Sequence, residues 1–441
     1  MTVSYLTRPD AQFDRVGLLN PMAKQVLFEH YVLPKEYQEV QTDSGACDNN
    51  SDWLIDYARK NLNLPEFQTD SQELVDDLRF ERYLSLLGRD RRNFTNWKAT
   101  KSAYYRLRSV LPAGLRRQFQ RIYFNNWSRI AFPHWPVDQT ADRIFKRMLV
   151  QVLRTLSLTR MPFIWFWPEG ARSAVVMTHD VEALAGRNFC SSLMDIDDSF
   201  GFKASFQIVP ESRYEVTDDF LQNMRQRGFE TNVQDLNHDG RLFDSYEQFL
   251  ARSKKINEYG KKFHAKGFRA AVLYRRQAWY GALDFEYDMS VPNVAHLEPQ
   301  PGGCCTVFPF SIGKLTELPL TTTQDCSLFY VLKDYSGSIW QSQLSSIVKG
   351  YGLASFLVHP DYLLDQRAQT CYKRLLEQLG KLRDAERLWI TLPGEVSDWW
   401  KLRGEMQLIP EGNGWRIEGV GSERARVGYA NLDGEDIVYT F

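Results

Sequence analysis

The stretch Ser173-Ala-Val-Val-Met-Thr-His-Asp-Val-Glu182 is an apolar run that ends in two acidic residues. A short continuous apolar run of this kind predicts a strand buried on both faces, as in a parallel sheet. Because side chains alternate along a strand, Asp180 and Glu182 are expected on one face and His179 on the other, in the core. Acidic residues at the carboxyl end of a parallel strand are typical of a site built on a barrel.

Short apolar strands and helical segments alternate along the chain around this run, from Phe163 onward. This alternation predicts parallel strands joined by helices, in a TIM-like or doubly wound α/β sheet. The expected strands are 173–178, 204–209, 230–233, 268–272, 354–358 and 388–391, and the expected helices are 195–200, 220–227, 246–262 and 364–382.

The composition changes on both sides of this α/β region, and three parts are expected. Residues 1–165 are mainly helical, with helical spacing of apolar residues over 72–87 and 141–158. Residues 166–395 form the α/β region. Residues 396–441 form a small antiparallel β appendage, with strands at 406–409, 414–417, 425–429 and 437–441 and glycine-containing turns between them.

Three further motifs follow the first acidic pair along the chain. They are Asn237-His238-Asp239-Gly240, Gly267-Phe-Arg269 and Phe356-Leu-Val-His359-Pro-Asp361. An acid at one strand end, a histidine after another strand, an arginine and a late histidine are the parts from which a hydrolytic site is assembled on a barrel.

The order and local context of these motifs resemble the polysaccharide deacetylases, which are the NodB-homology carbohydrate esterases of family 4. The resemblance covers about half of the chain and implies a distorted (β/α) barrel with a divalent metal, zinc or alternatively cobalt or nickel. It implies hydrolysis of an N-acetyl or O-acetyl group on a saccharide, with a metal-bound water as nucleophile. By the same resemblance Asp180 is the general base and Glu182 is a metal ligand. Arg269 pairs with the Asp180 carboxylate and holds it ionised, and His359 is the general acid that protonates the leaving amine.

One motif departs from the family pattern. The family has two histidines four residues apart, which places two imidazoles one helical turn apart on one metal ion. Here the sequence reads Gln234-Asp-Leu-Asn-His238, so an amide stands in the first position. An amide oxygen is a weaker zinc ligand than imidazole. The sequence leaves three interpretations open: an active enzyme with a looser metal site, a protein that binds carbohydrate or a partner without turnover, or a form substituted at this position.

Four more residues are candidates for binding the substrate. Asp288 and Glu317 lie in segments that resemble later loops of the family, and either could orient a sugar hydroxyl or cap a loop. Tyr274 follows the arginine motif, and His296 lies in a loop that could line a sugar pocket.

Bulk features exclude several classes of protein. The chain has 441 residues and a net charge of −1, and its 43% hydrophobic content is normal for a globular protein. It contains no apolar run long enough to span a membrane, no signal-peptide pattern at its start and no cysteine pair with zinc-binding spacing, so a reduced cytoplasmic protein is expected. No phosphate-binding loop, serine-hydrolase elbow or dinucleotide motif is present, and no nucleic-acid partner is expected.

A basic segment interrupts the neutral balance of the chain. Between Arg89 and Arg129 there are eleven Lys and Arg residues and one acid, Asp90. Such a block favours contact with phosphate or an anionic membrane, or else neutralisation by the acidic stretch before it. A cytoplasmic saccharide precursor that is lipid- or nucleotide-linked would suit this segment.

Overall fold

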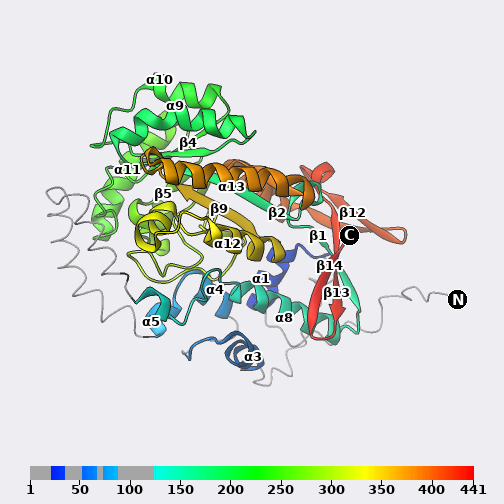
Figure 1. Ribbon diagram of the computed structural model, residues 1–441. Coiled ribbons are helices and arrows are strands. Elements are labelled where there is room, and N and C mark those ends of the chain that lie inside the picture. The colour runs from blue at the N-terminus through cyan, green and yellow to red at the C-terminus, as the bar shows by residue number, and fades with distance from the viewer. Residues whose placement is uncertain (1–20, 35–51, 67–72, 88–123, 125) are drawn as a thin grey trace. The chain divides into compact units, whose positions relative to one another are not determined.

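The computed structural model describes residues 21–34, 52–66, 73–87, 124 and 126–441 (Figure 1). The chain divides into two compact units. Unit 1 comprises Met1–Asp77, Thr140–Gly170 and Leu402–Phe441, and unit 2 comprises Leu78–Gln139 and Ala171–Lys401. Among the helices of the described ranges, none is long and apolar enough to cross a membrane.

Within the described residues, unit 2 is built on a nine-stranded sheet that curls into an incomplete barrel (Figure 1). The strand order is β10-β2-β3-β4-β5-β6-β8-β7, and β9 also pairs with β2. These strands pair in parallel, apart from the antiparallel pair β7 and β8. Their bounds are β2 Ser173–Val181, β3 Ser205–Ile208, β4 Glu230–Gln234, β5 Gly267–Arg269, β6 Tyr287–Asp288, β7 Phe310–Ile312, β8 Leu315–Glu317, β9 Leu353–Val358 and β10 Leu388–Thr391.

Strand β2 is an inner strand of this sheet and is buried on both faces, as its apolar sequence predicts. All nine of its residues are buried, and it pairs with β10, β9 and β3. Because its neighbours run parallel to it, their carboxyl ends lie at the same edge of the sheet as Asp180. The mixed α/β fold with a curled sheet, expected from the sequence, is therefore confirmed.

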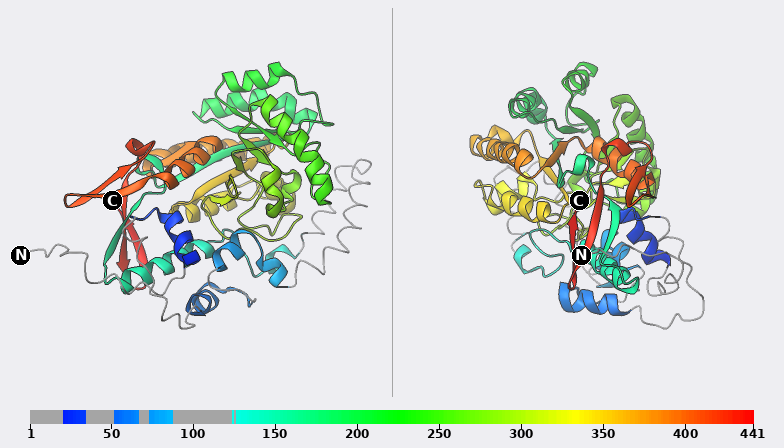
Figure 2. Two further views of the ribbon diagram at one scale, coloured as in Figure 1. Left: turned by 180° about the vertical axis from the view of Figure 1, so that it is seen from behind. Right: turned by 90° about the vertical axis from the view of Figure 1, so that its right-hand side faces the viewer.

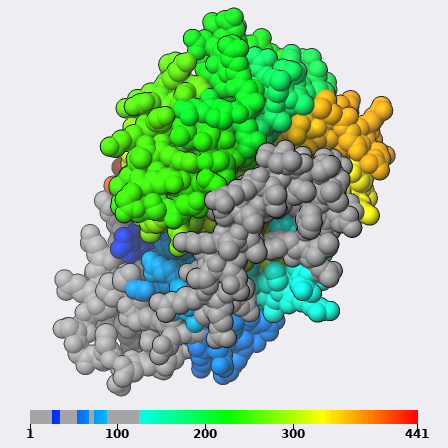
Figure 3. Space-filling model, turned by 90° about the vertical axis from the view of Figure 1, so that its left-hand side faces the viewer, coloured from blue at the N-terminus to red at the C-terminus, as the bar shows by residue number. Residues whose placement is uncertain are grey.

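Helices connect the strands and lie on the outside of the sheet (Figures 1 and 2). Ser245 and Asp365 cap α11 and α13 by accepting from backbone N–H groups of the first turn. The segment from α9 to α11, green in Figure 3, forms a continuous surface of unit 2. The helices of this region are α9 Leu184–Ser199, α10 Asp218–Gln226, α11 Tyr246–Phe263, α12 Ser338–Lys349, α13 Gln366–Ala385 and α14 Pro393–Glu405.

Two expected elements are shorter than their sequence patterns indicated. The helical run 72–87 is two helices, α4 Leu74–Arg79 and α5 Tyr83–Leu86, because Glu81 between them adopts a positive φ of 58°. The strand expected over 268–272 ends at Arg269. The chain then turns through Ala271–Leu273, where Val272 has a φ of 59°, so apolar content alone overestimated this strand.

Unit 1 combines helices with a small antiparallel sheet. Its helices are α1 Pro21–Tyr31, α3 Asp52–Leu62 and α8 Thr140–Thr155. Strand β1, Arg160–Ile164, pairs with β13, Val427–Asp433, which pairs with β14, Asp436–Thr440. Strands β11 Gln407–Glu411 and β12 Gly414–Glu418 form a separate hairpin. The expected β appendage is thus present, and β1 adds a strand to it that the sequence pattern did not indicate. The three-part domain division stays a prediction.

Candidate active site

Asp180 and Arg269 form a buried ion pair at the carboxyl ends of β2 and β5. Arg269 Nη1 donates to Asp180 Oδ1 at 2.5 Å and to Thr178 Oγ1 at 2.9 Å, while its Nε donates to the Met289 carbonyl at 3.0 Å. The Arg269 side chain is completely buried, and this carboxylate compensates its charge. The sequence predicted this pairing of an arginine with the proposed base, and the structure brings the two residues together.

The environment of Asp180 makes it a stronger base than an ordinary aspartate. Burial raises the pKa of the Asp180 carboxyl above its usual value, and the Arg269 guanidinium only partly opposes this effect. A carboxylate with a raised pKa accepts a proton more readily from a water molecule that it contacts.

Gln234 ends β4 and joins the two acidic residues of the first motif. Its Nε2 donates to Asp180 Oδ2 at 2.9 Å and to Glu182 Oε1 at 3.0 Å. Its Oε1 is buried and has no hydrogen-bond partner within the described residues. The opposite orientation of the amide would place this oxygen against two carboxylate oxygens, so the two contacts fix which atom faces inward.

His238 lies in the loop after β4, where the predicted helical turn is absent. Asp235 and His238 both have positive φ angles, 51° and 56°, and these turns return the chain toward the sheet edge. His238 Nε2 lies 2.7 Å from Glu182 Oε1, and Arg213 Nη2 lies 3.3 Å from His238 Nδ1. A guanidinium can only donate, so Nδ1 is the acceptor, and Nε2 carries the proton that it donates to Glu182.

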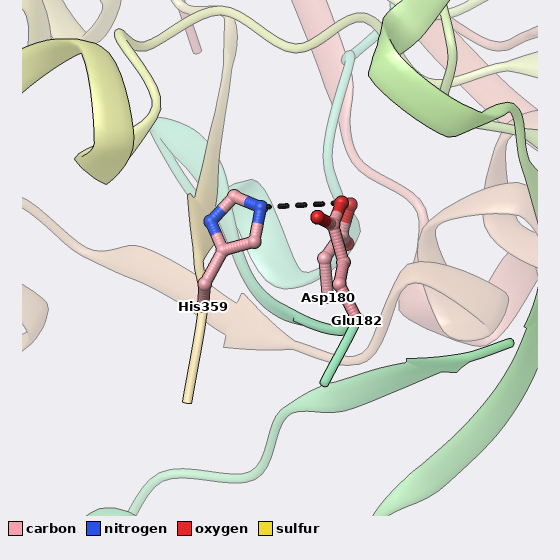
Figure 4. A group of neighbouring side chains, drawn as sticks. All are labelled: Asp180, Glu182 and His359. Carbon is pink, nitrogen blue, oxygen red and sulfur yellow. Dashed lines mark ion pairs between the residues drawn. The ribbon is translucent and has the colours of Figure 1, made fainter. Parts of the chain in front are cut away.

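His359 follows β9 and faces the acidic pair, as Figure 4 shows. Its Nδ1 lies 2.6 Å from Asp325 Oδ1, and its Nε2 lies 3.5 Å from Glu182 Oε1. Burial alone would lower the pKa of His359, but the charges of Asp325 and Glu182 outweigh it and raise that pKa well above its usual value. Conversely, burial alone would raise the pKa of Glu182, but His238 and His359 hold it well below its usual range.

Asp325 is a residue of this site that the sequence reasoning missed. Besides its contact with the ring, its Oδ2 accepts from the His359 backbone N–H at 2.7 Å. Asp325 lies in the helical turn that leads into the π-helix Ser327–Leu332, and no apolar strand precedes it to mark it. The polar run Thr321-Thr-Thr-Gln-Asp325 directly after Leu320 was the available signal. Arg213, the partner of His238, was also missed, because it lies on an exposed loop segment.

Asp180, Glu182 and His359 satisfy the spacing of a metal site, since each offers one ligand atom within 4.8 Å of the others. The N–H groups that point at these carboxylates leave no suitable place for a divalent cation. A cation needs lone pairs directed at it, whereas Gln234 directs N–H groups at two of these ligands and the inward nitrogen of His238 carries a proton. The carboxylates are instead satisfied by hydrogen bonds from the protein.

Asp288 and Glu317 form a separate buried pair at the ends of β6 and β8. Asp288 accepts from the Ser290 hydroxyl at 2.7 Å, and Glu317 Oε1 accepts from the Val291 backbone N–H at 3.0 Å. Burial raises the pKa of both carboxyls, and for Glu317 the neighbouring Asp288 raises it further. Both side chains are completely buried. Their predicted role in substrate binding stays a prediction.

The other candidates also occupy buried positions. His296 donates from Nε2 to the Pro133 carbonyl at 2.8 Å and stacks on Trp135. Tyr274 is buried in the turn after β5. His179 points away from the site, as the alternation along β2 predicts: its Nε2 lies 3.0 Å from Asp197 Oδ2 and its Nδ1 lies 3.2 Å from the Val358 carbonyl.

Comparison with known proteins gives no sequence relative and several structural ones. No protein-family profile matches the chain, and no curated protein matches it in sequence. Against solved structures, 31 chains match. Polysaccharide deacetylases are among them. The family named from the motifs is thus one whose solved structures this chain resembles.

Three of these structures show the range of the likeness. A candidate polysaccharide deacetylase from Mycobacterium smegmatis is 14% identical, with 56% of this chain and 96% of that chain covered and a TM-score of 0.42. A family 4 acetyl xylan esterase from Clostridium thermocellum, in complex with cobalt, is 13% identical, with 52% and 91% covered and a TM-score of 0.33. An allantoinase is 12% identical, with 53% and 92% covered and a TM-score of 0.40. A distant likeness of fold does not fix function, so the function has to come from the residues of this chain.

Proposed function

We propose that this protein is a hydrolase that removes an acetyl group from the nitrogen, or alternatively the oxygen, of a saccharide. The observation that supports this proposal most directly is the arrangement of His359 opposite Asp180 and Glu182 (Figure 4). A carboxylate that can accept a proton, facing a histidine that neighbouring carboxylates hold protonated, is a usual basis for acid–base catalysis. Asp180 is the unprotonated partner, and His359 is the protonated one.

The reaction follows from these protonation states. Asp180 takes a proton from a water molecule as the water oxygen attacks the acetyl carbonyl carbon. His359 then gives its proton to the leaving nitrogen as the carbon–nitrogen bond breaks, which yields acetate and a free amine. Arg269 keeps Asp180 oriented, and Asp325 keeps His359 oriented and charged. None of these steps passes through a metal ion, and the zinc, cobalt or nickel ion expected from the resemblance stays a prediction.

The saccharide is proposed from the motifs around Asp180, His238, Arg269 and His359, which resemble those of the deacetylases. A lipid- or nucleotide-linked sugar is the finer proposal, and it depends on the basic segment between Arg89 and Arg129. Residues 89–123 and 125 of that segment lie outside the described residues, so the structure describes only its last residues, 124 and 126–129.

Acetate release from a panel of acetylated saccharides tests the proposal. The panel contains N-acetylated oligosaccharides, an O-acetylated xylan and nucleotide-linked N-acetyl sugars. We expect release from at least one class by the full chain, and its loss in the Asp180→Asn and His359→Asn variants. Asp365→Asn, which alters the cap of α13 and the exposed pair with Arg367, is the matched control and should retain release. Absence of release from every class, or release that both site variants retain, would refute the proposed hydrolysis.

A second candidate function is binding of a saccharide without turnover. Gln234 favours it, because an amide replaces the imidazole of the family motif and occupies Asp180 Oδ2. Equilibrium binding of an acetylated saccharide, measured by calorimetry together with acetate analysis, separates the two functions. Saturable binding without acetate supports the second.

A further inference from the structure

The two carboxylates at the centre of the site have their negative charge compensated by the protein itself. Asp180 contacts the Arg269 guanidinium through Oδ1 and the Gln234 amide through Oδ2. Glu182 Oε1 contacts Gln234 and His238 and lies 3.5 Å from His359. In a metal centre, carboxylates in these positions would direct their lone pairs at the cation.

We infer that the Gln234 amide takes the place of a divalent cation between Asp180 and Glu182, and that Arg213 fixes His238 in the tautomer that excludes a metal. The site is then a metal-independent centre held together by hydrogen bonds. Gln234 and Arg213 act as positioning residues, through the carboxylates and the imidazole that they contact.

The position of Gln234 makes its amide a rigid bridge. Gln234 is the last residue of β4, is completely buried and pairs in register with Arg269 of β5. Its two N–H contacts differ in length by only 0.1 Å, at 2.9 and 3.0 Å. Rotating the amide would remove both contacts and bring three oxygens together in a buried space, which is unfavourable unless a cation lies between them. The amide orientation therefore reports whether a cation is bound.

Arg213 is an independent argument for the same conclusion. A histidine that binds a metal through one nitrogen donates its other N–H to a carboxylate, a carbonyl or water. Here the atom opposite His238 Nδ1 is Arg213 Nη2, which cannot accept. Arg213 is held in that position because the same Nη2 donates to the His238 carbonyl at 2.5 Å and its Nε donates to the Asn237 carbonyl at 3.3 Å. The lone pair of His238 thus faces Arg213, away from Glu182.

Equilibrium binding of Co²⁺ and Zn²⁺ to the purified full chain tests the inference without requiring turnover. The result therefore stands apart from the success or failure of the proposed hydrolysis. We expect wild-type protein and the Glu182→Gln variant to bind Co²⁺ and Zn²⁺ equally weakly, because Glu182 does not hold a metal ion in wild type. We expect the double variant Gln234→His with Arg213→Glu, which supplies an imidazole and an acceptor, to bind metal at least about 10-fold more tightly than any residual binding by wild type.

The single variant Arg213→Glu keeps the test decisive if the double variant does not fold, since Arg213 is exposed. With ¹⁵N-labelled histidine, of which the chain has seven residues, the His238 signal should show a protonated Nε2 in wild type and a shift toward protonated Nδ1 in Arg213→Glu. Arg241→Glu, the same charge change at an exposed arginine of the loop after β4, is the control and should leave that signal unchanged. One equivalent of metal bound to wild type and lost in Glu182→Gln would overturn the inference. So would a folded double variant that binds metal no better than wild type, or a His238 signal with a protonated Nδ1 in wild type.

Discussion

The guanidinium of Arg269 lies 2.5 Å from the Asp180 carboxylate, and the pair is closed off from solvent on both sides, with side-chain exposures of 0% and 3%. Arg269 is fixed in turn by Thr178 and the Met289 carbonyl. The base of the proposed reaction is therefore oriented from behind, by strand β5, while its second oxygen faces Gln234. One oxygen of Asp180 therefore holds the side chain in place through Arg269, and the other is on the side of the carboxylate that faces Gln234.

Asp180→Asn removes the base and keeps an acceptor for Arg269. We expect kcat/KM for acetate release to fall by about 100- to 10,000-fold, because the amide cannot take a proton from water. Urea denaturation should show that the protein remains folded with a cooperative transition. A variant with near wild-type kcat/KM would show that another group is the base.

Asp325→Asn should change the pH dependence of the reaction. Asp325 raises the pKa of His359, so its removal lowers that pKa. The acid must be protonated to act, and activity is lost as pH rises through its pKa, so the alkaline limb of the kcat/KM profile should move to lower pH. Asp334→Asn, which alters a nearby cap at the start of α12, is the control and should leave the limb in place. An unchanged alkaline limb in Asp325→Asn would contradict the role of this pair.

The gathering of Asp180, Arg269 and His359 could be predicted from the sequence, because each follows a strand and parallel strands share one carboxyl edge. The contacts that define the chemistry of the site could not. Asp325 contacts His359 from a helical turn 34 positions away in the sequence. The orientation of the Gln234 amide depends on two carboxylates, Asp180 and Glu182, at the end of another strand. Likewise, β5 is only three residues long because Val272 adopts a positive φ, which apolar composition does not encode.

Glu81→Gln should destabilise the protein strongly. Glu81 accepts from Arg275 Nε at 2.6 Å and from Arg275 Nη2, and it also accepts from the Gly303 backbone N–H. The substitution leaves a buried guanidinium without its counter-charge, which costs about 3–5 kcal/mol in the free energy of unfolding. Glu377→Gln, which breaks the exposed pair with Lys381, should leave the free energy of unfolding almost unchanged, because solvent screens that pair. Equal urea midpoints for the two variants would show that the buried pair is not stabilising.

His296 should make the protein less stable in acid. Burial lowers the pKa of His296 from 6.5 to about 4, although its contact with the Pro133 carbonyl partly opposes the shift. Between these values the unfolded chain binds a proton that the folded protein does not, so the free energy of unfolding falls as pH decreases from about 6.5 to about 4. His296→Gln should reduce this loss, as measured by urea midpoints at pH 7 and pH 5. Parallel pH dependence in the two proteins would contradict the prediction.

Two glycines should respond oppositely to substitution by alanine, because their surroundings differ. A Cβ on Gly352, just before β9, would lie 2.4 Å from Val307 Cγ2 and 3.0 Å from the Val307 carbonyl oxygen. Valine is stiff at χ1 and the carbonyl belongs to the backbone, so Gly352→Ala should cost about 1–3 kcal/mol in the free energy of unfolding. A Cβ on Gly380, inside α13, meets nothing within 4 Å, and Gly380→Ala should stabilise by about 0.8–1 kcal/mol through helix propensity. Urea midpoints that shift in the same direction for both variants would show that contact with Val307 does not determine the stability of Gly352→Ala. Because β9 also positions His359, Gly352→Ala should lower acetate release as well, whereas Gly380→Ala should leave it unchanged.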